Sequence, residues 1–202
     1  MMTRGDVLVV GTCDTKGEQL RFVRDRLQTN GLDTLLVDIS TRHLENGADI
    51  GPSDIVAAAD ASAASVFVDD RGIAVTRMGG ALLHFLESRD DIAGIIGLGG
   101  SGGTSMIAPA MQRLPIGLPK IMVSAVAASD IRPYVGLSDI VMIPSVVDID
   151  RLNRLSRTLL VNAANALAGM VRSDRPGFLD TRPAVGLTTA GVTTECLSLI
   201  HI

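Results

Sequence analysis

Short apolar runs alternate, along most of the chain, with segments that have the stripe of apolar residues typical of an amphipathic helix. This alternation constrains the fold more than any other feature. Five runs are apolar enough for buried strands: 7–10, 35–37, 92–96, 121–123 and 140–143. Between them, apolar residues recur every three or four positions, as on the buried face of a helix. Strands separated by helices pair in parallel through right-handed crossovers. We therefore predict a doubly wound, Rossmann-like α/β domain over residues 1–172, with helices on both faces of a parallel sheet.

The stripes predict four amphipathic helices, the first of which stops at Asn30-Gly31. Residues 39–70 are less regular, and we predict there a short helix over 52–59 and an additional strand over 66–68. The predicted buried helix positions are, in chain order, Leu20, Val23 and Leu27; Ala74, Met78, Ala81, Leu82 and Phe85; Met106, Ala110 and Leu114; Leu152, Leu155, Leu159, Ala163, Ala166 and Met170.

A second, incomplete unit is predicted after residue 172. The polar cluster Ser173-Asp174-Arg175-Pro176-Gly177 indicates a linker, which we place over 173–183. A strand-like run at 184–187 follows it. We interpret residues 184–202 as the truncated start of a second α/β subdomain.

Composition excludes several classes of function. The chain of 202 residues is 47% hydrophobic but only 2% aromatic, which suits an aliphatic core of buried strands. Its net charge of −4, without a basic run, gives no electrostatic footprint for nucleic acid. Apolar stretches stay below bilayer length, no leader-like segment precedes the first strand, and two cysteines cannot build a disulfide framework. We expect a cytoplasmic protein with neither nucleic acid nor membrane as partner, and no Cys/His metal site.

The third apolar run leads into the glycine-rich segment Gly97-Leu98-Gly99-Gly100-Ser101-Gly102-Gly103-Thr104. Glycines let the backbone approach a ligand closely, and the first turn of a following helix offers unpaired N–H groups to an anion. The segment fits the dinucleotide pattern G-x-G-x-x-G over 97–102 and the nucleophile-elbow pattern G-x-S-x-G over 99–103. It lacks the lysine of a Walker A loop. One loop therefore supports two chemistries, phosphate binding and serine hydrolysis.

The first strand leads into a second candidate anion loop, residues 11–17. Thr15 and Glu18 have the spacing of a capping box, which predicts a helix start beside Lys16. In a sheet of order 2-1-3-4-5, this loop and the glycine-rich loop flank one crevice. Lys16 would add a point charge to a phosphate, whereas Asp14 suits Mg²⁺, water or a sugar hydroxyl, with helix capping as its alternative role.

Further polar residues follow other strand ends. Asp38 ends the second strand, where an acid often binds ribose hydroxyls, although its spacing does not fit the fingerprint and an ordinary loop carboxylate is the alternative. Ser124 and Asp130 follow the fourth strand and would close the crevice, or form only a turn. Cys13 is expected to be a buried thiol. The candidate nucleotide-binding residues are Thr12, Asp14, Thr15, Lys16, Asp38, Gly99, Gly100, Ser101, Gly102, Gly103, Thr104, Ser124 and Asp130.

Together these segments resemble the family related to the ATP-binding N-terminal domain of the tomato mosaic virus resistance protein, found in bacteria and fungi. The resemblance implies two Rossmann-like subdomains, ATP in the first, and assembly into a homo-oligomer. Residues 127–130 read Ala-Ala-Ser-Asp where the family is expected to read Ala-Ser-Gly-Asp, and residues 198–202 do not look like family sequence. The matching segments are Gly11-Thr12-x-Asp14-Thr15-Lys16, 97–104, Met122-Val123-Ser124, Pro133-Tyr134-Val135-Gly136, Ser138-Asp139-Ile140, Leu152-Asn153-Arg154 and Gly191-Val192-Thr193-Thr194.

Three functions stay open at this point, and with them the question whether the chain is an enzyme. The first is a nucleotide-binding module that holds the phosphates of ATP, alone or with Mg²⁺, on loops 97–104 and 11–17, with an unknown small-molecule co-substrate. The second is a hydrolase with Ser101 as nucleophile, which lacks a credible base because only His201 follows it in hydrolase order. The third is a non-catalytic partner-binding protein that nucleotide stabilises.

Overall fold

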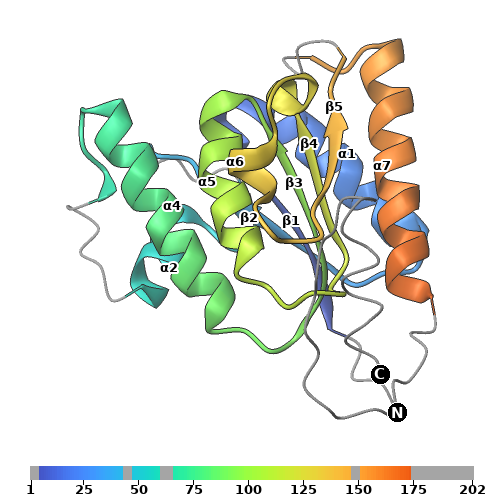
Figure 1. Ribbon diagram of the computed structural model, residues 1–202, viewed down its shortest axis with the longest axis horizontal. Coiled ribbons are helices and arrows are strands. Elements are labelled where there is room, and N and C mark those ends of the chain that lie inside the picture. The colour runs from blue at the N-terminus through green and yellow to red at the C-terminus, as the bar shows by residue number, and fades with distance from the viewer. Residues whose placement is uncertain (1–4, 43–46, 60–65, 147–150, 174–202) are drawn as a thin grey trace, which may run out of the picture.

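Five parallel strands form one sheet in the order β2-β1-β3-β4-β5 (Figure 1). They are β1 (Asp6–Gly11), β2 (Thr34–Asp38), β3 (Ile92–Gly99), β4 (Lys120–Ser124) and β5 (Val141–Pro144). The computed structural model describes residues 5–42, 47–59, 66–146 and 151–173, and every structural statement below concerns these residues. The predicted parallel sheet and its strand order are confirmed.

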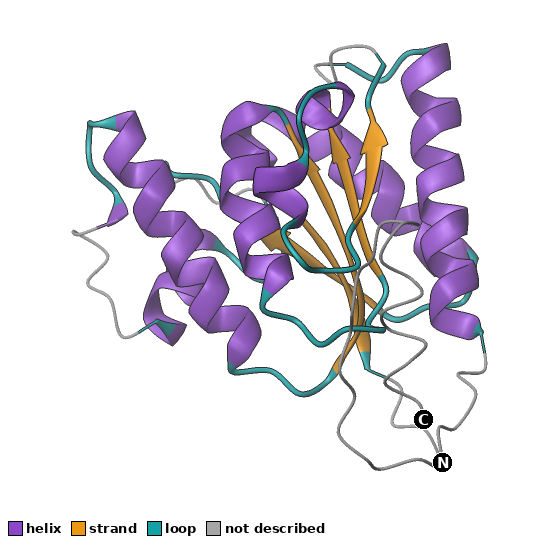
Figure 2. Cartoon of the chain, in the orientation of Figure 1, coloured by secondary structure: helices purple, strands orange, loops and turns teal. Residues whose placement is uncertain are grey.

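Helices cover both faces of this sheet (Figure 2). One face carries α1 (Cys13–Thr29) and α7 (Arg154–Arg172). The other carries α4 (Arg71–Glu87) and α5 (Ser101–Gln112), with α2 (Pro52–Ala58) packed on α4. Two short turns, η1 (Ala125–Ala128) and α6 (Arg132–Val135), lie between β4 and β5.

Successive residues of the central strands point to opposite faces and divide the core into two layers. In β1, Val7 and Val9 pack with α1 and α7, whereas Leu8 and Val10 pack with α4 and α5. All four side chains are at most 1% exposed. Because both faces are covered, the strands read as continuous apolar runs, which made them recognisable in the sequence.

The predicted helices are present, and the first ends where expected. Asn30 caps α1, and Gly31 follows it with φ of 69°, a left-handed conformation that favours glycine. The predicted core positions of α1 and α4 are all buried, and the short helix predicted over 52–59 is α2.

The strand predicted over 66–68 is wrong. Val66 is helical and 1% exposed, and the residues after it lead into α4 without pairing with the sheet. The outer edge of β2 is instead met by Ile50, which forms a parallel bridge with Val37. The Ile50 carbonyl accepts a hydrogen bond from the amide of Asp38 at 2.9 Å, so this part of the edge is already paired.

The stripe predicted for α7 is correct in part: Ala163 is buried, and Leu152, Leu159 and Met170 are partly buried against the core. Leu155 is 62% exposed and Ala166 is exposed as well. The buried face of α7 consists largely of small residues, whereas the predicted stripe was anchored mainly on leucines. The residues that α7 buries are Ser156, Leu160, Ala163, Ala164, Leu167 and Ala168.

The predicted second subdomain, and the linker beyond Ser173, lie outside the described residues. Within the described part of the chain, no helix combines the length and the apolar character needed to cross a membrane.

Candidate functional site

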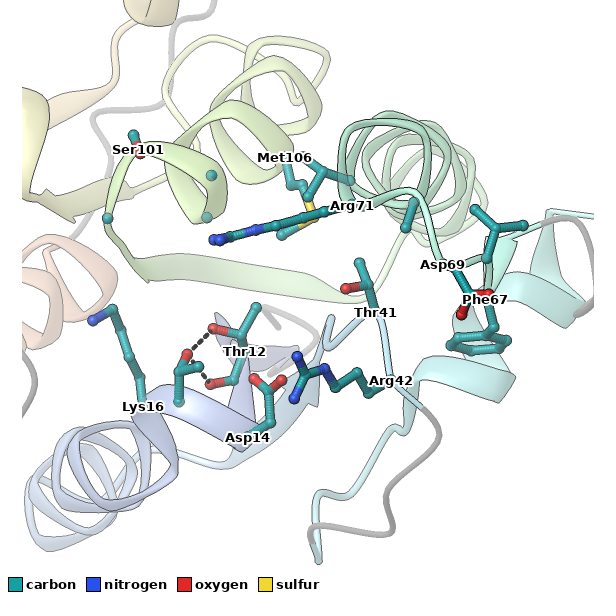
Figure 3. A pocket seen from close by; sticks show the side chains of 17 residues that line it. Thr12, Asp14, Lys16, Thr41, Arg42, Phe67, Asp69, Arg71, Ser101 and Met106 are labelled. Carbon is teal, nitrogen blue, oxygen red and sulfur yellow. Dashed lines mark hydrogen bonds between the residues drawn. The ribbon is translucent and has the colours of Figure 1, made fainter.

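The glycine-rich loop and the loop after β1 line one cavity at the carboxyl edge of the sheet (Figure 3). Its volume is about 730 Å³, in the range of about 300–1,000 Å³ typical of small-molecule sites. The strand order explains the convergence, since β1 and β3 are neighbours and both helices that follow them begin at this edge. The predicted residues that line the cavity are Thr12, Asp14, Thr15, Lys16, Gly100, Ser101, Gly102 and Gly103.

The start of α5 presents bare backbone to this cavity. Gly100 is the N-cap in an extended conformation, and its carbonyl accepts a hydrogen bond from the amide of Thr104 at 2.9 Å. The amides of residues 101–103 have no partner within the helix, and no side chain caps them. A Cβ on Gly100 would meet nothing within 4 Å. The helix end is therefore open to an anion.

Two other glycines act within the protein. A Cβ on Gly97 would lie 2.7 Å from Ile107 Cγ2 and from Met122 Sδ, so Gly97 lets α5 pack closely on β3. A Cβ on Gly99 would lie 2.7 Å from the amide nitrogen of Thr104, so Gly99 permits the turn into α5. The dinucleotide fingerprint assigns its first glycine to the turn, whereas Gly97 lies inside a strand. The fingerprint therefore does not hold residue by residue.

The first helix begins earlier than predicted. Its N-cap is Thr12 and its first residue is Cys13, so Thr15 lies inside the first turn. The hydroxyls of Thr12 and Thr15 hydrogen-bond to each other at 2.6 Å. The predicted capping box of Thr15 and Glu18 is wrong, because the hydroxyl and the amide of Thr15 both bond to Thr12. The backbone does leave the helical conformation at Lys16, where φ is −129° and ψ is 21°, so α1 is kinked at this residue.

The amides at the start of α1 are already hydrogen-bonded within the protein. The Cys13 amide donates to Asp38 Oδ1 at 2.9 Å, and the Asp14 amide donates to Ser40 Oγ at 3.2 Å. The next two amides donate to the carbonyl of Thr12. Unlike the first amides of α5, those of α1 are therefore occupied by partners within the protein. The loop before α1 instead lines the cavity with hydroxyl, carboxylate and ammonium groups.

The other predicted residues do not line the cavity: Asp38, Gly99, Thr104, Ser124 and Asp130. Asp38 is fully buried and holds the start of α1. The hydroxyls of Thr104 and Ser124 hydrogen-bond to each other at 2.6 Å and join α5 to β4. Asp130 is exposed and pairs with Arg132 at 2.7 Å, and hydrogen bonds from Arg132 lower the pKa of this carboxyl. Asp38, Thr104 and Ser124 thus join neighbouring elements beneath the cavity.

The far wall of the cavity was missed by the sequence analysis. It includes Arg42 and Arg71, and Figure 3 shows the Arg71 guanidinium reaching across from α4 toward the glycine-rich loop. With Lys16, three cationic side chains line the cavity, against the carboxylates of Asp14 and Asp69. One signal was available. Arg71 opens α4, where a cation opposes the helix dipole.

Cys13 and Ser101 are the two nucleophiles that the sequence analysis placed near the cavity. Cys13 is buried, as expected. Burial, and then the negative charge of Asp38, raises the pKa of its thiol to about 12. Ser101 is exposed at the start of α5, and its backbone lacks a strained positive φ. None of the residues that line the cavity is a histidine. Among the residues that line the cavity, the hydrolase alternative thus finds neither a strained elbow at Ser101 nor a histidine base.

The domain that carries this cavity has relatives among known proteins. Residues 5–176 match the N-terminal domain of the uncharacterised protein family UPF0261. UPF0261 proteins of Rhizobium meliloti and Clostridium tetani are 47% and 40% identical over 196 and 198 residues, and each match covers 96% of this chain and 49% of the relative. The ToMV resistance protein Tm-1 of Solanum lycopersicum is 37% identical over 219 residues, which cover 96% of this chain and 29% of that protein.

The chain spans about half the length of these bacterial relatives. The match to Tm-1 confirms the resemblance noted in the sequence. The chain belongs to the UPF0261 family, and residues 5–176 match that family's N-terminal domain.

Proposed function

We propose that this chain binds a nucleotide, ATP in particular, in the cavity between the starts of α1 and α5. The observation that carries the proposal is the open N-terminus of α5. Its amides at 101–103 have no partner within the helix, glycines keep side chains out of the way, and cationic groups line the same cavity. Such a helix end stabilises a phosphate through main-chain hydrogen bonds and the helix dipole.

The two loops contribute different groups. The glycine-rich loop would hold a phosphate with its amides, while the loop after β1 would add the Lys16 ammonium and the hydroxyls of Thr12 and Thr15. The Asp14 carboxylate repels a bare phosphate, so we assign it to a ribose hydroxyl or to a hydrated Mg²⁺. No cluster of three metal-ligating side chains occurs among the described residues. Mg²⁺ would therefore enter with the phosphates of the ligand.

The choice of ATP rests on the family resemblance, which implies an ATP-binding first subdomain. The proposal is limited to binding, and it assigns no catalytic residue. A small-molecule co-substrate and a non-catalytic, fold-stabilising nucleotide are both compatible with the same cradle of amides.

Isothermal titration with ATP and Mg²⁺ tests this proposal. A Gly102→Val variant places two methyl groups beside the free amides, and Lys16→Ala removes one of the lining cations. Because hydrogen bonds to charged groups contribute about 1.5–3 kcal/mol, we expect the double variant to bind ATP at least about tenfold more weakly than wild type.

Gly80→Val is the matched control, since Gly80 is exposed on α4, outside the cavity lining, and its Cβ would meet nothing within 4 Å. It should bind ATP like the wild type. Equal heats from wild type and the double variant, or no heat from wild type, would contradict the proposal.

A further inference from the structure

The proposed nucleotide site contains an arginine that comes from neither phosphate loop. Arg71 is the first residue of α4, and Asp70 caps that helix independently by accepting a hydrogen bond from the Ile73 amide at 3.0 Å. Among the described residues, the Arg71 guanidinium has no hydrogen-bond or ion-pair partner. Helix formation does not require a cation at this position, and the helix dipole disfavours one there.

The Arg71 side chain reaches the glycine-rich loop from across the cavity. Its Nη2 atom lies 3.9 Å from the point that a Cβ on Gly102 would occupy. In Figure 3 the guanidinium lies between the start of α5 and Thr12, while Lys16 approaches from α1. Two cations from different elements therefore line the cavity beside the start of α5.

We propose that Arg71 makes the site selective for a chain of at least two phosphates; this inference rests on the proposed nucleotide binding. The amides at the start of α5 cradle one phosphate. The planar guanidinium presents paired N–H donors that match the oxygens of an adjacent phosphate. A monophosphate seated on the amides leaves Arg71 without a second phosphate to bind. ATP and ADP therefore bind much more tightly than AMP.

The test compares the affinities of ATP, ADP, AMP and inorganic tripolyphosphate for wild type and for Arg71→Ala. In Arg71→Ala, the loss of charge-assisted hydrogen bonds should lower the affinities for ATP, ADP and tripolyphosphate by about 10- to 100-fold. The affinity for AMP should fall by less than about threefold. Arg71→Gln keeps a long polar side chain without the charge and should show the same collapse of the ATP-to-AMP ratio. Arg77→Ala, on the same helix but outside the cavity lining, should keep the wild-type ratio.

The outcomes separate this inference from the proposed function. If Arg71→Ala and Arg71→Gln keep the wild-type ratio of ATP affinity to AMP affinity, Arg71 does not select for the phosphate chain. Nucleotide binding would then stand without this inference. If wild type binds none of the four compounds, both proposals fail. Thermal unfolding of each variant shows whether a change in affinity reflects the site or the fold.

Discussion

A single buried lysine organises the start of β4. The Lys120 side chain is fully buried, and its Nζ pairs with Asp139 Oδ1 at 2.6 Å while donating to the carbonyls of Pro115 and Leu118. Asp139 also accepts a hydrogen bond from the Gly117 amide. Burial alone would raise the pKa of Asp139, but the hydrogen bonds from Lys120 and Gly117, with the Lys120 charge, hold it below its ordinary value. Lys120 thus has a structural role.

We expect Asp139→Asn to lower the free energy of unfolding at pH 7 by about 2 kcal/mol, because it leaves a buried ammonium without its counter-charge. Breaking a fully buried pair costs about 3–5 kcal/mol, and we discount that range because the Asp139 side chain is 38% exposed. A Lys120→Met/Asp139→Asn double variant should recover part of the loss. Urea unfolding measures both variants.

The same variant has a pH signature. A carboxyl whose folded pKa is depressed stabilises the fold above its ordinary pKa of 3.8, and that contribution is lost as the pH falls through the folded value. The difference in the free energy of unfolding between wild type and Asp139→Asn should therefore become smaller in acid. Equal stability of the two proteins at pH 7 would refute the structural role of the pair.

Between the elements β3 and α5, two adjacent glycines differ in how well they should tolerate a side chain. Gly99→Ala forces a Cβ against the backbone of residues 103 and 104, and overpacking of this kind costs about 1–3 kcal/mol. Gly100→Ala meets open space and costs only about 0.5 kcal/mol, because alanine is a poorer N-cap than glycine. Chemical denaturation of the pair checks this order, and a Gly100→Ala protein less stable than Gly99→Ala would reverse it.

For the whole molecule, the sheet was predictable because its strands are buried on both faces and their apolar runs need no knowledge of distant contacts. The convergence of the two loops followed from the strand order. The hydrogen-bond partners of the first α1 amides could not be predicted from local sequence. They are Asp38, at the end of β2, and Ser40, which lie 25 and 26 positions further along the chain. Arg71 was missed for the same reason, since the packing of α4 on α5 places it over the glycine-rich loop.

The most direct test of phosphate binding at the start of α5 is a titration of ¹⁵N-labelled protein with ATP and Mg²⁺, followed by amide NMR. We expect the amide resonances of Ser101, Gly102 and Gly103 to shift most strongly, because these amides become hydrogen-bond donors to phosphate, while the resonances of β5 stay in place. Saturable shifts confined to β5, or unchanged resonances at the start of α5 with ATP in large excess, would contradict this expectation.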